Sequence, residues 1–362
     1  AAQAGHDVIM CPTSHCYFDY YQASQENSPE AFGGLITLKK VYSFNPIPDE
    51  LTEEQKELVL GAQGNLWTEY VQTPQRAQVG VLPRMTALSE VLWSGPNKNS
   101  YQDFYGRLSF LTDRFRQLGW SYSSGSFMVS IDPDYDKKNR NYKINIISEK
   151  PGEDILFTID GTDPKKTSAV FTSPISIAKK TTIKAAMFMN ESDLGPVSEK
   201  TIYFSKAMGK KVLYKTIHSD RYPGSGDLTL VDGMTGSTAY NDGYWQGWHE
   251  DDVEIVVDLD TVEKINSVST SFLESQKSWI FLPTSIEVSF SIDNRKYQNK
   301  KIVNVENKNP NSKANRQIFD INQIGVSARY IKLKGVNLKK CPEWHPGSGG
   351  KTWVFIDEII VE

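Results

Sequence analysis

Two groups of polar and aromatic residues in the first third of the chain each follow a short apolar run. Tyr17 and Asp19 come after one run, and Trp67 and Glu69 come after the next. A phenol hydroxyl donates hydrogen bonds, carboxylates accept them, and an indole adds an apolar face. If both runs are strands of a barrel, side chains at their carboxyl ends face its active site. The alternative is that Tyr17 and Trp67 only cap the barrel core.

The elements that would position these residues have an α/β pattern. The apolar runs, residues 7–10 and 58–62, each precede a loop and then helical sequence. Strand, loop and helix in repetition are typical of an α/β fold.

Helix signals support this pattern. A helix is predicted from Ser100, a good N-cap residue, to Gly119, a residue type that often follows a helix. A shorter helix is predicted to begin at Pro83 and to carry Arg84 and Glu90 as a structural ion pair. Thr52 to Gln55 form a predicted capping box.

The chain changes character after a small-residue linker that begins at residue 122. From about residue 129 onward it has short strands and sharp turns with little helix, a pattern typical of β-sandwiches. Asp160-Gly161 is predicted to close a hairpin. The clearest predicted strands are residues 155–159, 181–188, 253–259, 285–292, 329–333 and 353–361.

Composition excludes several classes. The 40 basic and 44 acidic residues give a net charge of −4, so no nucleic-acid partner is expected. No apolar run is long enough for a membrane span. The 3 cysteines are too few for a disulfide framework, and Cys11 to Cys16 lack the further ligands of a closed zinc site. The 8 Trp, 17 Tyr and 16 Phe would suit sugar stacking, but β-rich cores also use aromatics.

The first residues form no signal peptide, and we expect the chain to be a piece of a longer protein.

Three stretches carry a resemblance to a known family: Tyr17-Phe-Asp19, Gly61-Ala-Gln-Gly-Asn-Leu-Trp67-Thr-Glu69 and Pro83-Arg-Met-Thr-Ala-Leu-Ser-Glu-Val-Leu-Trp93. They closely resemble the family 20 glycoside hydrolases, the β-N-acetylhexosaminidases. They match the last two strands and helices of that family's (β/α)8 catalytic barrel, over residues 1–121.

The resemblance implies removal of a terminal N-acetylhexosamine from an oligosaccharide or glycoconjugate, with retention and without a catalytic cofactor. In that family the sugar's own acetamido oxygen is the nucleophile. Tyr17 would donate a hydrogen bond to this oxygen. Asp19 and Glu69 would bind sugar hydroxyls, and Trp67 would form an apolar wall. A structural acceptor is the alternative role for Glu69.

The same family needs an adjacent Asp-Glu pair, which orients the acetamide and supplies the general acid. The two Asp-Glu dipeptides here do not fit that role. Asp49-Glu50 lies in a loop before the capping box, and strand alternation would turn Asp357 and Glu358 to opposite faces. We therefore expect the pair to lie upstream, this fragment alone to be inactive, and its partial barrel to need the upstream half for stability.

The middle zone, residues 122–206, resembles the chitobiase C-terminal β domain and is predicted to be a small β-sandwich. The resemblance rests on Phe157 to Pro164, Phe171 to Ile175 and Ile183 to Ala185. Asp160, Thr162 and Asp163 are interpreted as turn residues.

The last zone, residues 212–362, resembles a discoidin-like (coagulation-factor type C) jelly roll. The resemblance rests on Leu230 to Gly233, Tyr244 to Trp248, Val256 to Leu259, Leu282-Pro283 and Phe355 to Ile359. It implies a structural Ca²⁺ with oxygen ligands from Asp232, Thr238 and Glu358. Met234 stands where the family often has a second Asp, so a site without metal is the alternative.

Aromatic residues of the last zone divide into two groups. Trp279, Trp344 and His345 lie in loop-like sequence and are candidates for stacking on a glycan, whereas Trp245 and Trp248 are predicted to be core. The chain is thus predicted to be multidomain, with the C-terminal portion of a TIM barrel, a β-sandwich and a jelly roll. An extracytoplasmic location is expected. The alternative function is a non-catalytic carbohydrate-binding or adhesion protein.

Overall fold

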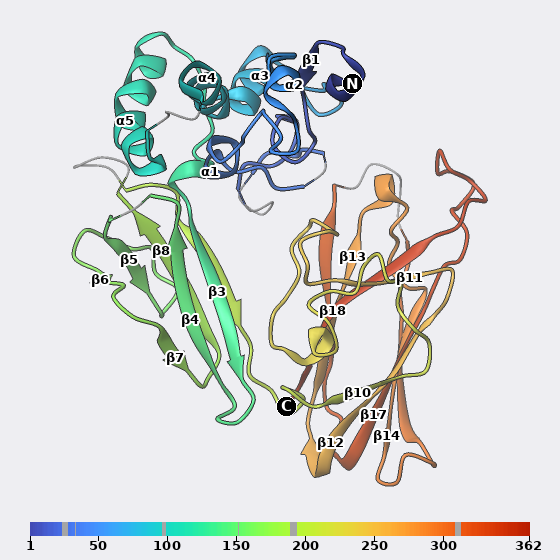
Figure 1. Ribbon diagram of the computed structural model, residues 1–362. Coiled ribbons are helices and arrows are strands. Elements are labelled where there is room, and N and C mark those ends of the chain that lie inside the picture. Colours follow the sequence, from blue (N-terminus) through green and yellow to red (C-terminus); the bar gives the residue numbers. More distant parts are fainter. Residues whose placement is uncertain (24–27, 33, 96–98, 151, 189–193, 308–312) are drawn as a thin grey trace. The chain divides into compact units, whose positions relative to one another are not determined.

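The computed structural model describes residues 1–362 apart from 24–27, 33, 96–98, 151, 189–193 and 308–312 (Figure 1). The chain forms two compact units. One consists of Ala1–Asp132, Asn145–Pro174 and Ile183–Glu199, and the other of Pro133–Ile144, Ile175–Thr182 and Lys200–Glu362. The predicted middle zone is therefore shared between the units, and its three-way separation from the flanking zones stays a prediction.

The first unit opens with an α/β segment. Strands β1 (Val8–Met10) and β2 (Val59–Ala62) pair in parallel, as the strand, loop and helix pattern suggests. The helices of this segment are α1 (Leu38–Tyr42), α2 (Glu53–Lys56), α3 (Pro74–Val81), α4 (Arg84–Ser94) and α5 (Tyr101–Gln117). None of the described helices is long and apolar enough to cross a membrane.

Helix α5 is confirmed as predicted. The Ser100 side chain accepts a hydrogen bond from the Asp103 N–H, which satisfies one of the free donors of the first turn. The buried face carries Phe104, Leu108 and Phe115. Helix α4 begins one residue later than predicted, with Pro83 at the N-cap. The Thr52 capping box is present, but it opens a helix of only four residues.

The middle strands form two antiparallel sheets. Their orders are β3-β4-β7 and β6-β5-β8-β9. The strands are β3 (Val129–Asp136), β4 (Asn141–Ser148), β5 (Ile155–Thr158), β6 (Ala169–Val170), β7 (Ile175–Ile177), β8 (Thr181–Met187) and β9 (Ser198–Ile202). The hairpin predicted at Asp160-Gly161 is present, since β5 pairs antiparallel with β6, but its loop is long and spans residues 159–168. Asp160 closes a local turn by accepting the Thr162 N–H at 3.0 Å.

The C-terminal β domain, from β10 to β18, has two sheets with one shared core. One sheet has the order β10-β12-β17-β14-β15 and the other the order β11-β18-β13-β16. The strands are β10 (Lys211–Tyr214), β11 (Gln246–His249), β12 (Val253–Ile265), β13 (Val268–Glu274), β14 (Ser285–Ser291), β15 (Gln298–Asn304), β16 (Asn315–Ile321), β17 (Val326–Val336) and β18 (Trp353–Val361). Inward residues of both sheets, such as Val257, Phe272 and Ile331, fill the core.

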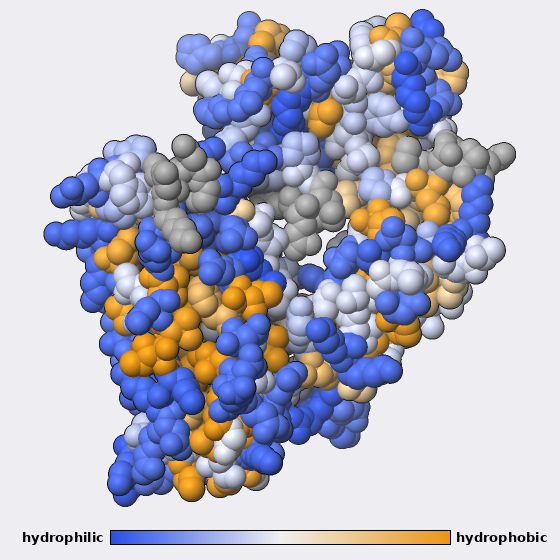
Figure 2. All heavy atoms as spheres, turned by 180° about the vertical axis from the view of Figure 1, so that it is seen from behind, coloured by the Kyte–Doolittle hydropathy of each residue, from blue (hydrophilic) through white to orange (hydrophobic). Residues whose placement is uncertain are grey.

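The tryptophans of this domain differ in burial, as predicted for core and loop positions. Trp245 and Trp248 are almost fully buried, which confirms their core assignment. Apolar side chains also reach the surface of the domain on the face seen in Figure 2. Exposed large hydrophobic residues of the domain include Ile217, Val262, Ile292, Ile302 and Ile318.

Candidate functional sites

The loops that follow β1 and β2 stay paired beyond the strands themselves. Tyr17 and Asn65 form a parallel bridge. The Asn65 N–H donates to the Cys16 carbonyl at 2.7 Å, and the Phe18 N–H donates to the Asn65 carbonyl at 2.6 Å. The four predicted site residues, Tyr17, Asp19, Trp67 and Glu69, therefore lie next to one another at the carboxyl ends of parallel neighbours.

Asp19 is the buried member of this group, with 8 % of its surface exposed. Burial raises the pKa of its carboxyl. The N–H groups of Asp19 and Trp67 lower that pKa, the Glu69 charge raises it, and the Arg84 charge lowers it. Within the described residues, Asp19 Oδ1 has no hydrogen-bond partner. A buried acceptor without a donor is costly for the protein alone and suits a ligand hydroxyl.

The other members of the group are more accessible. Tyr17 is half-buried and packs edge-on against Tyr20, with ring centroids 5.6 Å apart. Trp67 is 56 % exposed, so the core-capping interpretation is wrong for this side chain in the described chain. Glu69 is exposed. The group thus offers one hydroxyl, two carboxylates and an apolar ring face.

Arg84 does not form the predicted ion pair with Glu90. Glu90 instead pairs with Arg107 of α5 at 2.7 Å and accepts the Tyr42 hydroxyl at 2.9 Å. Six positions apart, Arg84 and Glu90 point to different sides of α4. Arg84 is fully buried and donates only to backbone carbonyls among the described residues. The Pro83-Arg84 motif draws attention to this position in the sequence. Nothing in the sequence pattern, however, predicts the hydrogen bonds from Arg84 to backbone carbonyls.

The two Asp-Glu dipeptides are placed as follows. Asp49 and Glu50 lie in an exposed turn. Asp357 and Glu358 lie on β18, but the predicted strand alternation was wrong there. The register against β13 shifts between Ile356 and Ile359, both of which belong to the core. The extra residue of this β-bulge lets both acids lie between two inward-facing positions.

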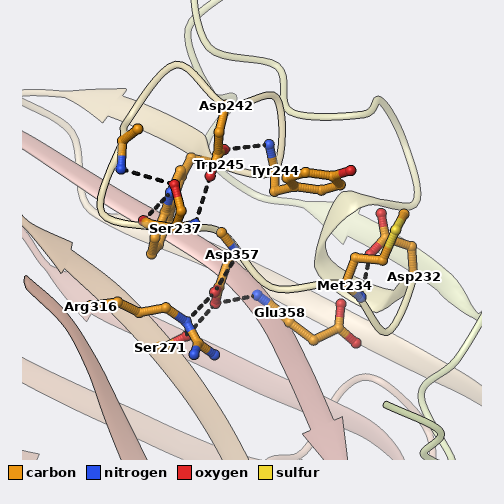
Figure 3. Close-up of polar contacts among 12 residues, drawn as sticks. Asp232, Met234, Ser237, Asp242, Tyr244, Trp245, Ser271, Arg316, Asp357 and Glu358 are labelled. Atoms are coloured by element: carbon orange, nitrogen blue, oxygen red, sulfur yellow. Dashed lines mark hydrogen bonds and ion pairs between the residues drawn. The ribbon is translucent and has the colours of Figure 1, made fainter. Parts of the chain in front are cut away.

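Asp357 is engaged by the surrounding chain (Figure 3). Its carboxylate accepts hydrogen bonds from Arg316 Nε at 2.8 Å, Ser271 Oγ at 2.5 Å and the Gly236 N–H at 3.0 Å. The group is fully buried, and burial raises its pKa while Arg316 and Ser271 lower it. Asp357 is therefore a structural acceptor that joins β13, β16, β18 and the residue 236 loop.

Glu358 faces Asp232 across the neighbouring turn (Figure 3). Both side chains are buried, at 2 % and 4 % exposure. Burial raises the pKa of Asp232 to about 7, although the Met234 N–H and Ser225 Oγ donate to its carboxylate at 2.8 Å each.

Burial, followed by the charges of Asp232 and Asp357, raises the pKa of Glu358 well above the usual value for a glutamate. The N–H groups of Gly233 and Asp232 are near enough to lower this pKa. Neither makes a well-formed hydrogen bond, and among the described residues both Glu358 carboxylate oxygens lack a partner.

Two of the three predicted metal ligands are thus brought together. A buried carboxylate with two unpartnered oxygens beside a second acid fits a hard cation. Thr238 is exposed, and no hydrogen bond or ion pair of the described chain links it to either acid. No group of three His, Cys, Asp or Glu side chains gathers as metal ligands in the described ranges. The carboxylate oxygens of Asp232 and Glu358 are donors of the kind that Ca²⁺ prefers.

One partner of this site could not be found from sequence. The Tyr142 hydroxyl of β4 donates a hydrogen bond to the Asp232 carbonyl. Tyr142 is 1 % exposed, and burial raises its pKa, with further contributions from the charges of Asp232 and Glu358. Ninety residues separate the two along the chain, and no motif links them.

The predicted glycan-contacting residues form one aromatic cluster. Trp279 and Trp344 are 41 % and 39 % exposed. His345 is buried and contacts both, with ring centroids 6.3 Å from Trp279 and 6.0 Å from Trp344. Its Nδ1 accepts the Gly347 N–H at 3.0 Å, so Nε2 carries the proton and donates to the Gln276 carbonyl at 3.0 Å. His345 is therefore a buried, hydrogen-bonded residue that packs edge-on against both tryptophans.

Trp279 is held in an unusual backbone conformation. Its φ is 62°, in the left-handed region that bulky residues rarely adopt. Its ring lies against Gly347 and Gly350, where an added Cβ would come within 2.7 Å and 2.5 Å of the indole. Backbone strain of this kind persists only where the surroundings enforce it and is frequent at ligand sites.

The ends of the chain match two protein-family models. Residues 1–96 match the catalytic domain of glycosyl hydrolase family 20, and residues 214–359 match the F5/8 type C domain. Residues 144–202 match a third model, described as Fn3 associated. The chain therefore carries a segment that matches family 20 and a β-rich domain that matches the F5/8 type C model, as the sequence motifs indicated.

Two curated relatives of the chain are named as hexosaminidases. A β-hexosaminidase of Porphyromonas gingivalis is 32 % identical over 207 residues, which cover 54 % of this chain and 26 % of that protein. A β-N-acetylhexosaminidase of Cellulomonas fimi is 34 % identical over 110 residues, covering 30 % of this chain and 22 % of the relative. The chain thus spans about a quarter of the length of the curated relatives it matches.

Solved structures with local similarity include two sugar-related proteins. The family 20 β-N-acetylhexosaminidase of Streptomyces coelicolor is 22 % identical with a TM-score of 0.31, covering 33 % of this chain and 24 % of that one. A fucose binding module of Streptococcus pneumoniae is 20 % identical with a TM-score of 0.31, covering 44 % and 94 %.

Proposed function

We propose that residues 1–121 are the C-terminal portion of a (β/α)8 barrel and form one side of the active site of a β-N-acetylhexosaminidase. The observation that carries this proposal is the placement of Tyr17, Asp19, Trp67 and Glu69 at the carboxyl ends of two parallel strands, within a segment that matches family 20. The substrate would be an oligosaccharide or glycoconjugate with a terminal β-linked N-acetylhexosamine.

The roles follow from the side-chain chemistry. The sugar's acetamido oxygen attacks the anomeric carbon, and the glycosidic bond breaks as a general acid protonates the leaving oxygen. The Tyr17 hydroxyl donates to the acetamido oxygen, which aligns the nucleophile and stabilises the charge that passes through it. Asp19 accepts a sugar hydroxyl at its unpartnered Oδ1. Glu69 accepts a second hydroxyl, and Trp67 covers the acetyl methyl and ring face.

The Asp-Glu pair that orients the acetamide and supplies the acid would come from residues upstream of Ala1. Asp49 and Glu50 are exposed, and Asp357 is occupied by Arg316 and Ser271. The activity therefore belongs to the whole protein, and this chain alone would not hydrolyse a glycoside.

The test is hydrolysis by the full-length protein of 4-nitrophenyl glycosides with and without the 2-acetamido group. The proposal predicts turnover of the N-acetyl-β-glucosaminide or N-acetyl-β-galactosaminide with retention at the anomeric carbon. It also predicts no turnover of the plain β-glucoside, because that sugar lacks the internal nucleophile. Equal turnover of both would contradict it.

The C-terminal β domain supports a second role in carbohydrate binding. We propose that Trp279 and Trp344 stack on a glycan while His345 holds them, and that a structural Ca²⁺ binds at Asp232 and Glu358 with a nearby carbonyl and Thr238. Bound there, the ion would neutralise two buried acids. The strained, glycine-enclosed Trp279 supports the glycan site, and the unpartnered Glu358 oxygens support the metal site.

A protein that acts on glycans with this pair of domains is proposed to be extracytoplasmic, with the middle strands forming a β-sandwich. The alternative function is a non-catalytic carbohydrate-binding or adhesion protein. Heat of glycan binding to the full-length protein without any glycoside hydrolysis would favour that alternative.

A further inference from the structure

Arg84 is a fully buried cation with an unusual set of partners. Nη1 donates to the Ile36 carbonyl at 3.0 Å, and Nη2 donates to the carbonyls of Phe18 at 2.5 Å and Gly80 at 2.6 Å. Its Nε has no partner among the described residues. A buried guanidinium bound only to neutral acceptors is costly, and burial lowers the pKa of Arg84 to about 9. An apolar residue would pack there at lower cost if packing were its only purpose.

The carbonyl that Arg84 holds is the one between Phe18 and Asp19. On the other side of Phe18, its N–H donates to the Asn65 carbonyl at 2.6 Å. Peptide groups are planar, so these two hydrogen bonds fix the peptide planes on both sides of Phe18. They thereby set the directions in which the flanking residues, Tyr17 and Asp19, project their side chains.

The Phe18 ring is enclosed as tightly as its backbone. The Arg84 guanidinium carbon lies 5.0 Å from the ring centroid, an attractive cation–π arrangement. A Cβ at Gly64 would come within 2.5 Å of the ring, so the β2 loop passes directly against it. Phe18 is therefore an anchor held by two segments, the start of α4 through Arg84 and the loop after β2 through Gly64 and Asn65.

We propose that Arg84 is a positioning residue for the sugar-binding group, acting through Phe18 on Tyr17 and Asp19. This inference rests on the proposed function. A planar fork with several donors reaches carbonyls of three separate segments, whereas a lysine ammonium is a compact point charge that cannot span them. The charge of Arg84 also favours the ionised form of Asp19, the form that accepts a hydroxyl.

The experiment compares Arg84→Lys with Arg107→Lys in the full-length protein. Both variants keep the charge, and Arg107 lies in an exposed ion pair on α5. We expect Arg84→Lys to lower kcat about 100-fold, because small misplacements of reacting groups have effects of that size. Arg107→Lys should stay within about twofold of the wild type. Hydrogen–deuterium exchange of residues 16–22 should accelerate only in Arg84→Lys.

A second pair of variants covers the case in which Arg84→Lys does not fold. Gly64→Ala presses on the Phe18 ring from the loop after β2 and should likewise lower kcat and accelerate the exchange of residues 16–22. Gly106→Ala is its control, since a Cβ there meets nothing within 4 Å. Unchanged exchange, or accelerated exchange with unchanged kcat, would overturn the proposal. A wild type that hydrolyses no N-acetylhexosaminide would overturn the proposed function instead, and the exchange comparison would then decide alone whether Arg84 holds the segment.

Discussion

Tyr17 lies opposite Asn65 in a parallel bridge that extends the pairing of β1 and β2 into the loops that follow them. This bridge sets the register of the whole candidate site. It brings the Asp19 carboxylate close enough to accept the Trp67 N–H, and it places the Glu69 charge within reach of Asp19. Two sequence motifs 50 residues apart thus become one surface, and the first two predictions below depend on it.

Asp19→Asn should weaken substrate binding, with KM rising about 10-fold at neutral pH. The ionised carboxylate accepts the sugar hydroxyl, and a charged hydrogen bond contributes about 1.5–3 kcal/mol. Because burial raises the pKa of Asp19, wild-type KM should rise on acidification at a higher pH than for an ordinary aspartate. Asp49→Asn, in an exposed turn, is the control. An unchanged KM in Asp19→Asn would exclude a role in binding.

The raised pKa of Asp19 also makes the stability of the protein depend on pH. A carboxyl with a raised pKa in the folded state binds more protons there than when unfolded, so its contribution to stability is present at low pH and is lost as the pH rises through the folded pKa. The Asp19→Asn variant, which cannot ionise there, should not lose this stability as the pH rises. The free energy of unfolding, measured against pH for both proteins, should therefore diverge only above the unfolded pKa of about 3.9.

Asp357→Asn should destabilise the C-terminal β domain by about 3 kcal/mol, because it leaves a cation and several donors without their buried acceptor. The matched control is Asp258→Asn, which removes a pair of the same chemistry, Arg329–Asp258, on the more exposed side of β12. That variant should lose about 1 kcal/mol or less. Urea unfolding followed by fluorescence of the buried Trp245 and Trp248 measures both. Equal losses would show that burial does not set the difference.

Ca²⁺ should raise the melting temperature of the C-terminal β domain, since an ion that binds only the folded state stabilises it by about 2.7 kcal/mol at 100 times its Kd. Glu358→Gln should abolish most of this increase. Without Ca²⁺ the same variant should be at least as stable as the wild type, because burial disfavours the charged form of Glu358 and the amide carries no charge. Thr238→Val tests the third predicted ligand. Identical Ca²⁺ responses of wild type and Glu358→Gln would reject the site.

Trp279→Ala and Trp344→Ala should each weaken glycan binding about 10-fold, because each removes an apolar ring face, and burying a large apolar side chain contributes about 1.5–3 kcal/mol. Calorimetric titration with galactose, N-acetylglucosamine and N-acetylgalactosamine measures this. Trp93→Ala is the control, since Trp93 is 93 % exposed on α4. If all three variants bind like the wild type, the glycan contacts lie elsewhere.

Local signals were sufficient for much of the fold. The helix that begins after Ser100 ends at Gln117, close to the glycine expected beyond it, because capping and apolar spacing act over a few residues. The strand predicted over residues 353–361 has the same bounds in the structure. The family motifs likewise placed Tyr17, Asp19, Trp67 and Glu69 in one segment.

Contacts between distant segments could not be predicted in this way. Arg84 was assigned to Glu90 because both lie on one helix, whereas their partners come from other segments: Phe18 and Ile36 for Arg84, and Arg107 for Glu90. The bulge at Asp357 arises from the pairing of β18 with β13. A prediction from period-two alternation cannot anticipate the extra residue of such a bulge.

The most direct measurement of the central claim is the turnover of an aryl N-acetyl-β-glucosaminide by the full-length protein carrying Tyr17→Phe. Removing a single donor from developing charge lowers kcat by about 10²–10³-fold. We expect a loss of that size in Tyr17→Phe, with KM and the melting temperature nearly unchanged. Tyr122→Phe, on the segment after α5, should retain wild-type turnover. A Tyr17→Phe protein with undiminished kcat would contradict the assignment of this surface as the acetamido-binding side of an active site.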